Sequence, residues 1–367
     1  MGKLTNRLLS KLAVESKAQE DSASKTESTL QIASKEEFQK RSIAMIGAGS
    51  FGTALAIHIA KNGFQTTLWG RDEDHIHEMC ATSSNERYLP DIKFPKSMRV
   101  SSDLKNTINN ADEVILAIPS HAFHHILENI PKPKHGIAWL TKGIDPSTNQ
   151  PLSQLVINKW GETFPLCVIS GPSFAKEVAN GMPTTLVVAG NNSDYINKIS
   201  QIFRSSSLRC YLSHDIIGVQ ICGAVKNVLA IACGISDGLN FGANAKSALI
   251  TRGLLEMRRI GTALGAEAET FMGLAGLGDL VLTCTDNQSR NRRFGIQIGQ
   301  GKSVADAIKN IGQVVEGAQN SEQIYEISCK LKLELPICHA VYDILKRNKT
   351  PKDAAYELMN RPMQDEL

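Results

Sequence analysis

The eight cysteines of this sequence include no Cys-x-x-Cys pair and no Cys/His spacing of the kind that binds zinc. Cys167, Cys222 and Cys233 lie inside apolar runs, which indicates reduced, buried thiols. The pattern excludes a disulfide scaffold, and we expect no metal site. The expected location is the cytoplasm, where thiols stay reduced.

The charges of the chain form no basic block, and its formal net charge is only +3. Scattered charge of this kind argues against a nucleic-acid partner. The N-terminus lacks the continuous apolar core of a signal peptide. One long apolar stretch, 216–236, carries Lys226 near its middle, and a charge at that depth is costly in lipid. We expect a buried helix there, and no membrane span.

The first forty residues differ from the rest of the 367-residue chain. Residues 16–39 are rich in Ser, Lys, Glu and Gln and poor in apolar side chains, so they cannot offset the entropy of ordering. We interpret 1–40 as a flexible tail. The remainder is long enough for two domains, and it shows no internal repeat of fixed period.

From Ser42 the chain alternates between strand-like and helix-like segments, which is typical of a mostly parallel sheet covered by helices. After about Tyr211 the strand patterns end and long helical patterns follow. We therefore predict an α/β protein with an N-terminal Rossmann-type doubly wound sheet over 41–212 and an all-helical domain over 213–367. The expected strands are 42–46, 65–69, 113–118, 136–141, 166–170 and 184–189, and the expected helices are 53–62, 216–235, 245–264, 304–311, 318–331 and 351–358.

A Gly-x-Gly-x-x-Gly turn lies where a dinucleotide site requires it, directly after a strand and at the start of a helix. Gly47 permits the tight turn, Gly49 lets the backbone approach a pyrophosphate, and Gly52 lets the helix pack closely on the strand. The free N–H groups at the start of the helix favour phosphate. The pattern predicts binding of NAD or NADP.

The residues that follow the second strand leave the choice between NAD and NADP open. An acidic residue about 20 positions past the glycines accepts from the ribose 2′-hydroxyl of NAD. Here Arg71, which suits a 2′-phosphate, precedes Asp72, which is compatible with NAD. The balance favours NADP.

Lys226 is the single charge of its apolar helix, so burial should lower its pKa toward the value of a useful general acid. A lysine that reaches the surface or pairs with a buried carboxylate fits the same pattern. Two clusters of residues favour a catalytic role for Lys226 over a structural one. A glycine-rich run, 273–279, ends in Asp279, a natural partner for a lysine, and 286–293 crowd amides, a hydroxyl and guanidiniums that suit phosphate.

These segments together resemble the bacterial-type NAD(P)-dependent glycerol-3-phosphate dehydrogenases. The matching segments are 46–56 (IGAGSFGTALA), 141–143 (TKG), 170–177 (SGPSFAKE), 223–228 (GAVKNV), 275–280 (AGLGDL), 287–293 (NQSRNRR) and 314–317 (VVEG). They occur in order from Ser42 to the last helices, and the segment before Ser42 lies outside the family pattern.

The resemblance implies roles for individual residues. Lys226 is implied as the general acid and base that protonates the alkoxide formed by hydride transfer to dihydroxyacetone phosphate, with Lys142 and Asp279 tuning its charge. The implied substrate contacts are Lys142, Gly171, Ser173, Lys226, Asp279, Ser289, Arg290 and Asn291. The implied cofactor contacts are Gly47, Gly49, Ser50, Phe51, Gly52, Arg71, Lys142, Ala175, Arg290, Val314 and Glu316. It also implies a homodimer and a supply of glycerol 3-phosphate for phospholipid synthesis.

Three other readings compete with this one. A dehydrogenase of the same architecture that acts on 3-hydroxy acids shares the glycine turn and a catalytic lysine, but it does not predict the phosphate cluster at 287–293. A nucleotide-sensing regulator without activity predicts losses among Lys142, Lys226, Asp279 and Arg290, all of which are present. The hypothesis of a scaffold protein is supported only by the predicted flexible tail.

Overall fold

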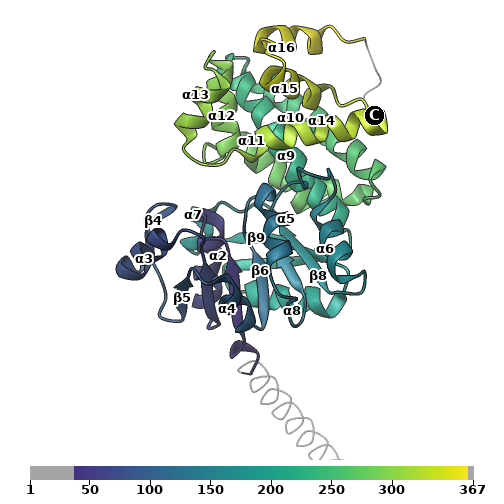
Figure 1. Ribbon diagram of the computed structural model, residues 1–367. Coiled ribbons are helices and arrows are strands. Elements are labelled where there is room, and N and C mark those ends of the chain that lie inside the picture. The colour runs from purple at the N-terminus through teal and green to yellow at the C-terminus, as the bar shows by residue number, and fades with distance from the viewer. Residues whose placement is uncertain (1–36, 363–367) are drawn as a thin grey trace, which may run out of the picture.

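The computed structural model describes residues 37–362. It consists of a sheet flanked by helices and, beside it, a body made of helices (Figure 1). Most of the segment interpreted as a tail, 1–36, lies outside the described residues. Of the remainder, Phe38 packs edge-on against Phe64 with ring centroids 5.6 Å apart, and Gln39 Nε2 donates to the Asn62 carbonyl.

An eight-stranded sheet has the order β10-β9-β8-β7-β6-β1-β2-β5. All its neighbours are parallel except β8 and β9. Its strands are β1 (Ser42–Ile46), β2 (Gln65–Trp69), β5 (Met98–Ser101), β6 (Glu113–Leu116), β7 (Ile137–Trp139), β8 (Leu166–Ser170), β9 (Thr184–Gly190) and β10 (Leu208–Ser213). Because β1 pairs with β2 on one side and β6 on the other, a crevice opens between their carboxyl ends. The predicted doubly wound sheet is confirmed.

Helices cover both faces of the sheet, so its central strands are buried on both sides and their sequences are almost continuously apolar. These helices are α2 (Ser50–Lys61), α3 (Glu73–Thr82), α4 (Leu104–Asn109), α5 (Ser120–Asn129), α6 (Leu152–Trp160), α7 (Ala175–Ala179) and α8 (Ser193–Phe203). A two-stranded hairpin, β3 (Ser84–Asn85) and β4 (Leu89–Lys93), follows α3.

The predicted helical C-terminal part is also confirmed. Its elements are α9 (Ile216–Gly238), α10 (Gly242–Ala263), the 3₁₀ turn Ala268–Met272, the π turn Leu274–Gly278, α11 (Asp279–Thr285), α12 (Arg290–Gly299), α13 (Val304–Ile311), α14 (Glu316–Leu331), α15 (Pro336–Lys346) and α16 (Pro351–Met359). The central helix α9 is long and apolar enough to cross a membrane, but 89% of its most apolar window is buried inside the protein. It is therefore a core helix, as Lys226 in its middle led us to expect.

Glycines bring α12 unusually close to α9. A Cβ at Gly234 would lie 2.1 Å from the carbonyl oxygen of Arg292, and a Cβ at Gly295 would lie 2.2 Å from that of Ile231. Only glycine fits such contacts, since real Cβ atoms do not approach this closely. The close packing places the N-terminus of α12 beside the middle of α9.

Candidate active site

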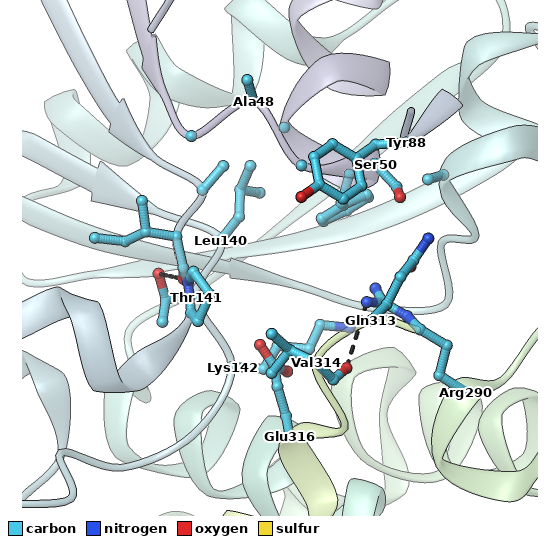
Figure 2. A pocket seen from close by; sticks show the side chains of 18 of the residues that line it. Ala48, Ser50, Tyr88, Leu140, Thr141, Lys142, Arg290, Gln313, Val314 and Glu316 are labelled. Atoms are coloured by element: carbon cyan, nitrogen blue, oxygen red, sulfur yellow. Dashed lines mark hydrogen bonds between the residues drawn. The ribbon is translucent and has the colours of Figure 1, made fainter. Parts of the chain in front are cut away.

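A cleft of about 1510 Å³ runs between the carboxyl ends of the strands and the helical part. One wall carries the glycine turn, the end of β2 and the segment after β7. The other carries α9, α11, the N-terminus of α12 and the 312–316 segment. Figure 2 shows Ser50, Leu140 and Thr141 on the sheet side of the cleft, and Arg290, Val314 and Glu316 on the helical side.

The glycine turn has the geometry that a dinucleotide requires. Gly47 adopts φ +127°, and a Cβ there would lie 2.3 Å from the Ala117 carbonyl oxygen, so the turn cannot accommodate a side chain. A Cβ at Gly49, in contrast, would meet no atom within 4 Å. Gly49 is also the N-cap of α2, and no side chain caps this helix. The first N–H groups of α2 are therefore available to a phosphate in the cleft.

The turn after β2 presents two residues of opposite charge to the cleft. Asp72 caps α3, because its Oδ1 accepts from the His75 N–H at 3.1 Å. Its Oδ2 lies 3.1 Å from Arg87 Nη1. The cap and the Arg87 pairing together lower the pKa of Asp72. The neighbouring Arg71 is exposed and has no hydrogen bond or ion pair to any other described residue.

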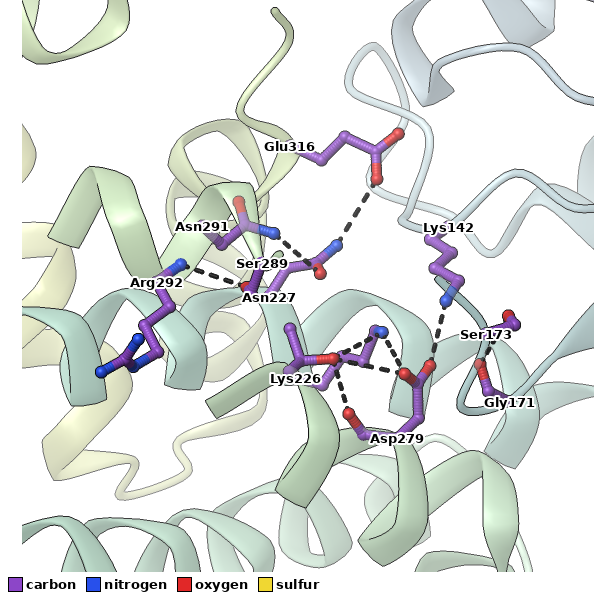
Figure 3. A network of polar contacts seen from close by, with 11 residues as sticks. Lys142, Gly171, Ser173, Lys226, Asn227, Asp279, Ser289, Asn291, Arg292 and Glu316 are labelled. Carbon is purple, nitrogen blue, oxygen red and sulfur yellow. Dashed lines mark hydrogen bonds and ion pairs between the residues drawn. The ribbon is translucent and has the colours of Figure 1, made fainter. Parts of the chain in front are cut away.

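Two lysines meet one carboxylate at the base of the cleft (Figure 3). Lys226 Nζ lies 2.5 Å from Asp279 Oδ1, and Lys142 Nζ lies 3.0 Å from Asp279 Oδ2. Lys226 also donates to Thr283 Oγ1 at 2.9 Å, and that hydroxyl donates to the Asp279 carbonyl oxygen at 2.6 Å. Lys226 and Asp279 are almost fully buried, so the Lys226 ammonium has a fixed position and direction.

The charges of this trio shift one another's pKa values. Burial, helped by the nearby charge of Lys142, lowers the pKa of Lys226 to about 7, although Asp279 acts in the opposite direction. Burial opposes the charge of Lys142, but Asp279 outweighs it and raises the pKa of that lysine. Burial likewise opposes ionisation of Asp279, and the two lysines outweigh it, so its pKa is lowered. Lys226 is thus the group of the three that can gain and lose a proton near neutral pH.

The N-terminus of α12 supplies donors beside this trio. Ser289 is the N-cap, and its hydroxyl accepts from the Arg292 N–H. Asn291 Nδ2 donates to Asn227 Oδ1 at 2.9 Å, which ties α12 to the residue after Lys226. Arg290 Nη1 reaches the Val314 carbonyl oxygen at 3.4 Å along the same wall of the cleft. A guanidinium, an amide, a hydroxyl and a helix N-terminus thus converge at one corner of the cleft, a set that suits phosphate.

Arg292 has a different position from its neighbours. Its side chain points away from the trio (Figure 3) and does not line the cleft. Its Nε donates to Asp237 Oδ2 at 2.9 Å, its Nη1 donates to Asn287 Oδ1, and Lys246 pairs with the other Asp237 oxygen at 2.8 Å. Arg292 therefore fastens the segment that carries the phosphate-type donors to the end of α9.

All the predicted site residues except Gly171 line the cleft. Gly171 lies behind it at φ +135°, where a Cβ would meet the Thr185 carbonyl oxygen at 3.0 Å, and its own carbonyl accepts from Ser173 Oγ at 3.0 Å. Sequence reasoning missed Thr283, Asn227 and Tyr88. Thr283 lies one helical turn after Asp279 on α11, and this spacing could have revealed it. The sequence offers no such signal for Tyr88, which reaches the cleft from the β3–β4 hairpin.

Comparison with known proteins gives one consistent result. A model of the NAD-dependent glycerol-3-phosphate dehydrogenase N-terminus matches residues 42–196, and a model of the C-terminus of the same family matches residues 215–356. A glycerol-3-phosphate dehydrogenase [NAD(P)+] of Legionella pneumophila is 55% identical over 89% of this chain and 99% of the relative. The enzyme of the same name from Aeromonas salmonicida is 48% identical over 88% of this chain and 98% of the relative.

A solved structure agrees. The crystal structure of glycerol-3-phosphate dehydrogenase from Coxiella burnetii superposes with a TM-score of 0.85 at 44% identity, over 88% of this chain and 99% of that one. The two family models together cover most of the chain, and they contain the glycine turn, the lysine–aspartate trio and the α12 N-terminus described above. The chain belongs to the NAD-dependent glycerol-3-phosphate dehydrogenase family of oxidoreductases.

Proposed function

We propose that this protein is an NAD(P)-dependent glycerol-3-phosphate dehydrogenase, which interconverts dihydroxyacetone phosphate and sn-glycerol 3-phosphate by reversible hydride transfer. The observation that carries the proposal is the buried trio of Lys142, Lys226 and Asp279, which lies in one cleft with a dinucleotide-type glycine turn and a corner of phosphate-type donors. Cofactor, carbonyl and phosphate each have a matching set of groups within that cleft.

The cofactor side of the cleft is formed by Gly47, Gly49, Ser50, Phe51, Gly52, Arg71, Lys142, Ala175, Arg290, Val314 and Glu316. The open space at Gly49 and the uncapped start of α2 fit a pyrophosphate. When bound, the nicotinamide supplies or accepts the hydride. Lys142 Nζ lies 6.0 Å from the ring centre of Phe51 on the cofactor side and 3.0 Å from Asp279 Oδ2 on the substrate side, so this lysine stands between the two sides. Arg71 has no polar partner among residues 37–362, whereas Asp72 is already engaged by His75 and Arg87, and this difference favours NADP over NAD.

The substrate side is formed by Lys142, Gly171, Ser173, Lys226, Asp279, Ser289, Arg290 and Asn291. Ser289, Arg290 and Asn291 hold the phosphate group at the start of α12. Gly171 acts through its backbone, because its carbonyl positions the Ser173 hydroxyl. The carbonyl oxygen of the substrate faces Lys226, within reach of its proton.

Lys226 is the catalytic general acid and base. With a pKa of about 7 it is partly protonated at neutral pH, and it gives a proton to the alkoxide oxygen as hydride reaches the carbon. In the reverse direction the neutral amine takes the proton from the alcohol. Asp279 and Thr283 hold the amine in place, and the positive charge of Lys142 stabilises the developing alkoxide.

Further assignments follow from the same proposal. The domains are 41–212 for the dinucleotide and 213–367 for the substrate. All eight thiols are free, which fits a reducing cytoplasm. The protein acts as a homodimer, as its family resemblance implies, and it supplies glycerol 3-phosphate for phospholipid synthesis.

The test is a substrate comparison that follows the absorbance of the reduced nicotinamide. We expect oxidation of NADPH with dihydroxyacetone phosphate and little with unphosphorylated dihydroxyacetone. Arg290→Met should abolish most of that difference, whereas Arg99→Met, an exposed arginine outside the cleft, should preserve it. Equal rates with the two ketones, or a preference for 3-hydroxy acids, would remove the phosphate from the proposal.

A further inference from the structure

The β3–β4 hairpin brings a second arginine to the adenosine end of the cleft. Arg87, at the tip of this hairpin, lines the cleft together with Arg71, Asp72 and Tyr88. Tyr88 and Ser50 project into the same space (Figure 2). Arg87 is sixteen positions after Arg71 in the sequence, so the motif that singles out Arg71 gives no sign of it.

The hairpin is fixed to the glycine turn, which holds its tip in place. The fully buried Asn85 donates from Nδ2 to the Ala48 carbonyl oxygen at 3.0 Å and to Thr53 Oγ1 at 2.8 Å. Its Oδ1 accepts from the Tyr88 N–H at 3.2 Å and lies 3.0 Å from His75 Nε2. The Tyr88 ring packs edge-on against His75, and the Arg87 guanidinium lies 5.3 Å from the Tyr88 ring centre. Arg87 is therefore held beside Asp72 by that ion pair and by a hairpin that Asn85 ties to the loop that receives the cofactor.

Asp72, the one carboxylate in this part of the cleft lining, is occupied by these surroundings. One of its oxygens caps α3 and the other pairs with Arg87. It is a poor acceptor for a ribose 2′-hydroxyl for that reason, and Arg87 offsets its charge. The pair is about half exposed on each side, so it is weak, and a phosphate dianion can compete for the Arg87 guanidinium.

We propose that Arg87 and Arg71 together form the receptor for the 2′-phosphate of NADP, and that Arg87 is the residue that sets the preference for NADP over NAD. Arg71 contributes a guanidinium that has no hydrogen bond or ion pair to another described residue, and Arg87 contributes one that exchanges Asp72 for the phosphate. This inference rests on the dinucleotide site of the proposed function, and it names the groups that select between the two cofactors.

The test measures binding without any turnover. Isothermal titration with 2′,5′-ADP and with 5′-AMP compares ligands with and without the 2′-phosphate. Arg87→Ala should weaken 2′,5′-ADP about tenfold or more and change 5′-AMP less than twofold, because one charge-assisted contact is lost. Arg87→Lys should restore part of the loss, and the matched control Arg99→Ala should leave both affinities unchanged.

Two results would overturn the proposal. Equal weakening of both ligands in Arg87→Ala would show that the residue only supports the hairpin, and unchanged 2′,5′-ADP affinity would show that Arg71 acts without it. Neither measurement contains the ketone substrate. A failure to reduce dihydroxyacetone phosphate would therefore refute the proposed reaction while leaving this test of the phosphate receptor intact.

Discussion

Replacing Asp279 by asparagine should move the pH dependence of ketone reduction to lower pH. In the native protein Asp279 Oδ1 lies 2.5 Å from Lys226 Nζ and favours its charged form against the cost of burial. Asparagine keeps the size of the side chain and removes the charge. Lys226 then remains buried beside the positive Lys142 without the carboxylate that it pairs with in the native protein.

The expected magnitude follows from the burial of the pair. Breaking a buried ion pair costs about 3–5 kcal/mol, which corresponds to a pKa lower by roughly two or more. With a native pKa of about 7, half of Lys226 is protonated at pH 7. After the substitution Lys226 would be protonated in about one molecule in a hundred, so the reductive kcat at pH 7 should fall by about 50-fold.

The assay is the reductive kcat with NADPH and dihydroxyacetone phosphate across pH 5.5 to 8.5. The native rate should decline with a midpoint near pH 7, and the decline in Asp279→Asn should already be complete at that pH. Glu113→Gln is the matched control, because it removes a fully buried carboxylate at the first residue of β6, away from the cleft. A midpoint that stays near pH 7 in Asp279→Asn would refute the assignment of this titration to Lys226.

Three further outcomes are expected. Gly47→Ala should lower the free energy of unfolding by about 1–3 kcal/mol because of the positive φ at this position, whereas Gly49→Ala should leave stability unchanged and weaken NADPH binding. Urea unfolding measures the first effect and fluorescence titration with NADPH measures the second. Equal effects of the two substitutions would contradict the different roles assigned to these glycines. Arg292→Met should raise the KM for dihydroxyacetone phosphate several-fold with less change in the KM for NADPH, and Arg292→Lys should recover part of the lost substrate affinity. Steady-state kinetics in which both KM values change equally would exclude the role of Arg292 in anchoring the start of α12 to α9. Burial raises the pKa of Glu256 to about 6, so its protonated form stabilises the fold at low pH and that contribution is lost as pH rises through 6. Between pH 4.5 and 7 the native protein should lose roughly 1.5 kcal/mol more unfolding free energy than Glu256→Gln, and parallel pH curves would disprove the shift.

The sequence predicted the parts of the fold that repeat a strong pattern. The central strands are buried on both faces, so they appear as apolar runs, and α13 was predicted with its observed ends, Val304–Ile311. The edge strands β5 and β10 and the hairpin β3–β4 were missed. These strands are partly exposed, so their side chains carry little hydrophobic pattern. Helices α11 and α12 were missed as well, because they lie among glycines and polar residues that interrupt the apolar pattern of a helix.

Some residues of the candidate site could likewise be predicted from the sequence, and others could not. Gly47 and Lys226 stand out in the sequence, because each is unusual in its local pattern. The pairing of Lys226 with Asp279 joins residues 53 positions apart, and that of Lys142 with Asp279 joins residues 137 apart, so only the fold could establish them. Arg290 lines the cleft and Arg292 points away from it because of the direction of helix α12. Composition alone does not distinguish two arginines in one cluster.

The most direct test of the account is reduction of dihydroxyacetone phosphate by Lys226→Met, measured together with NADPH binding. Methionine keeps the apolar stem of the lysine and removes its proton. We predict a loss of kcat of about 100-fold to 10,000-fold, with NADPH affinity within twofold of the native value. Turnover within tenfold of the native rate would show that another group moves the proton, and the assignment of Lys226 as the general acid would be wrong.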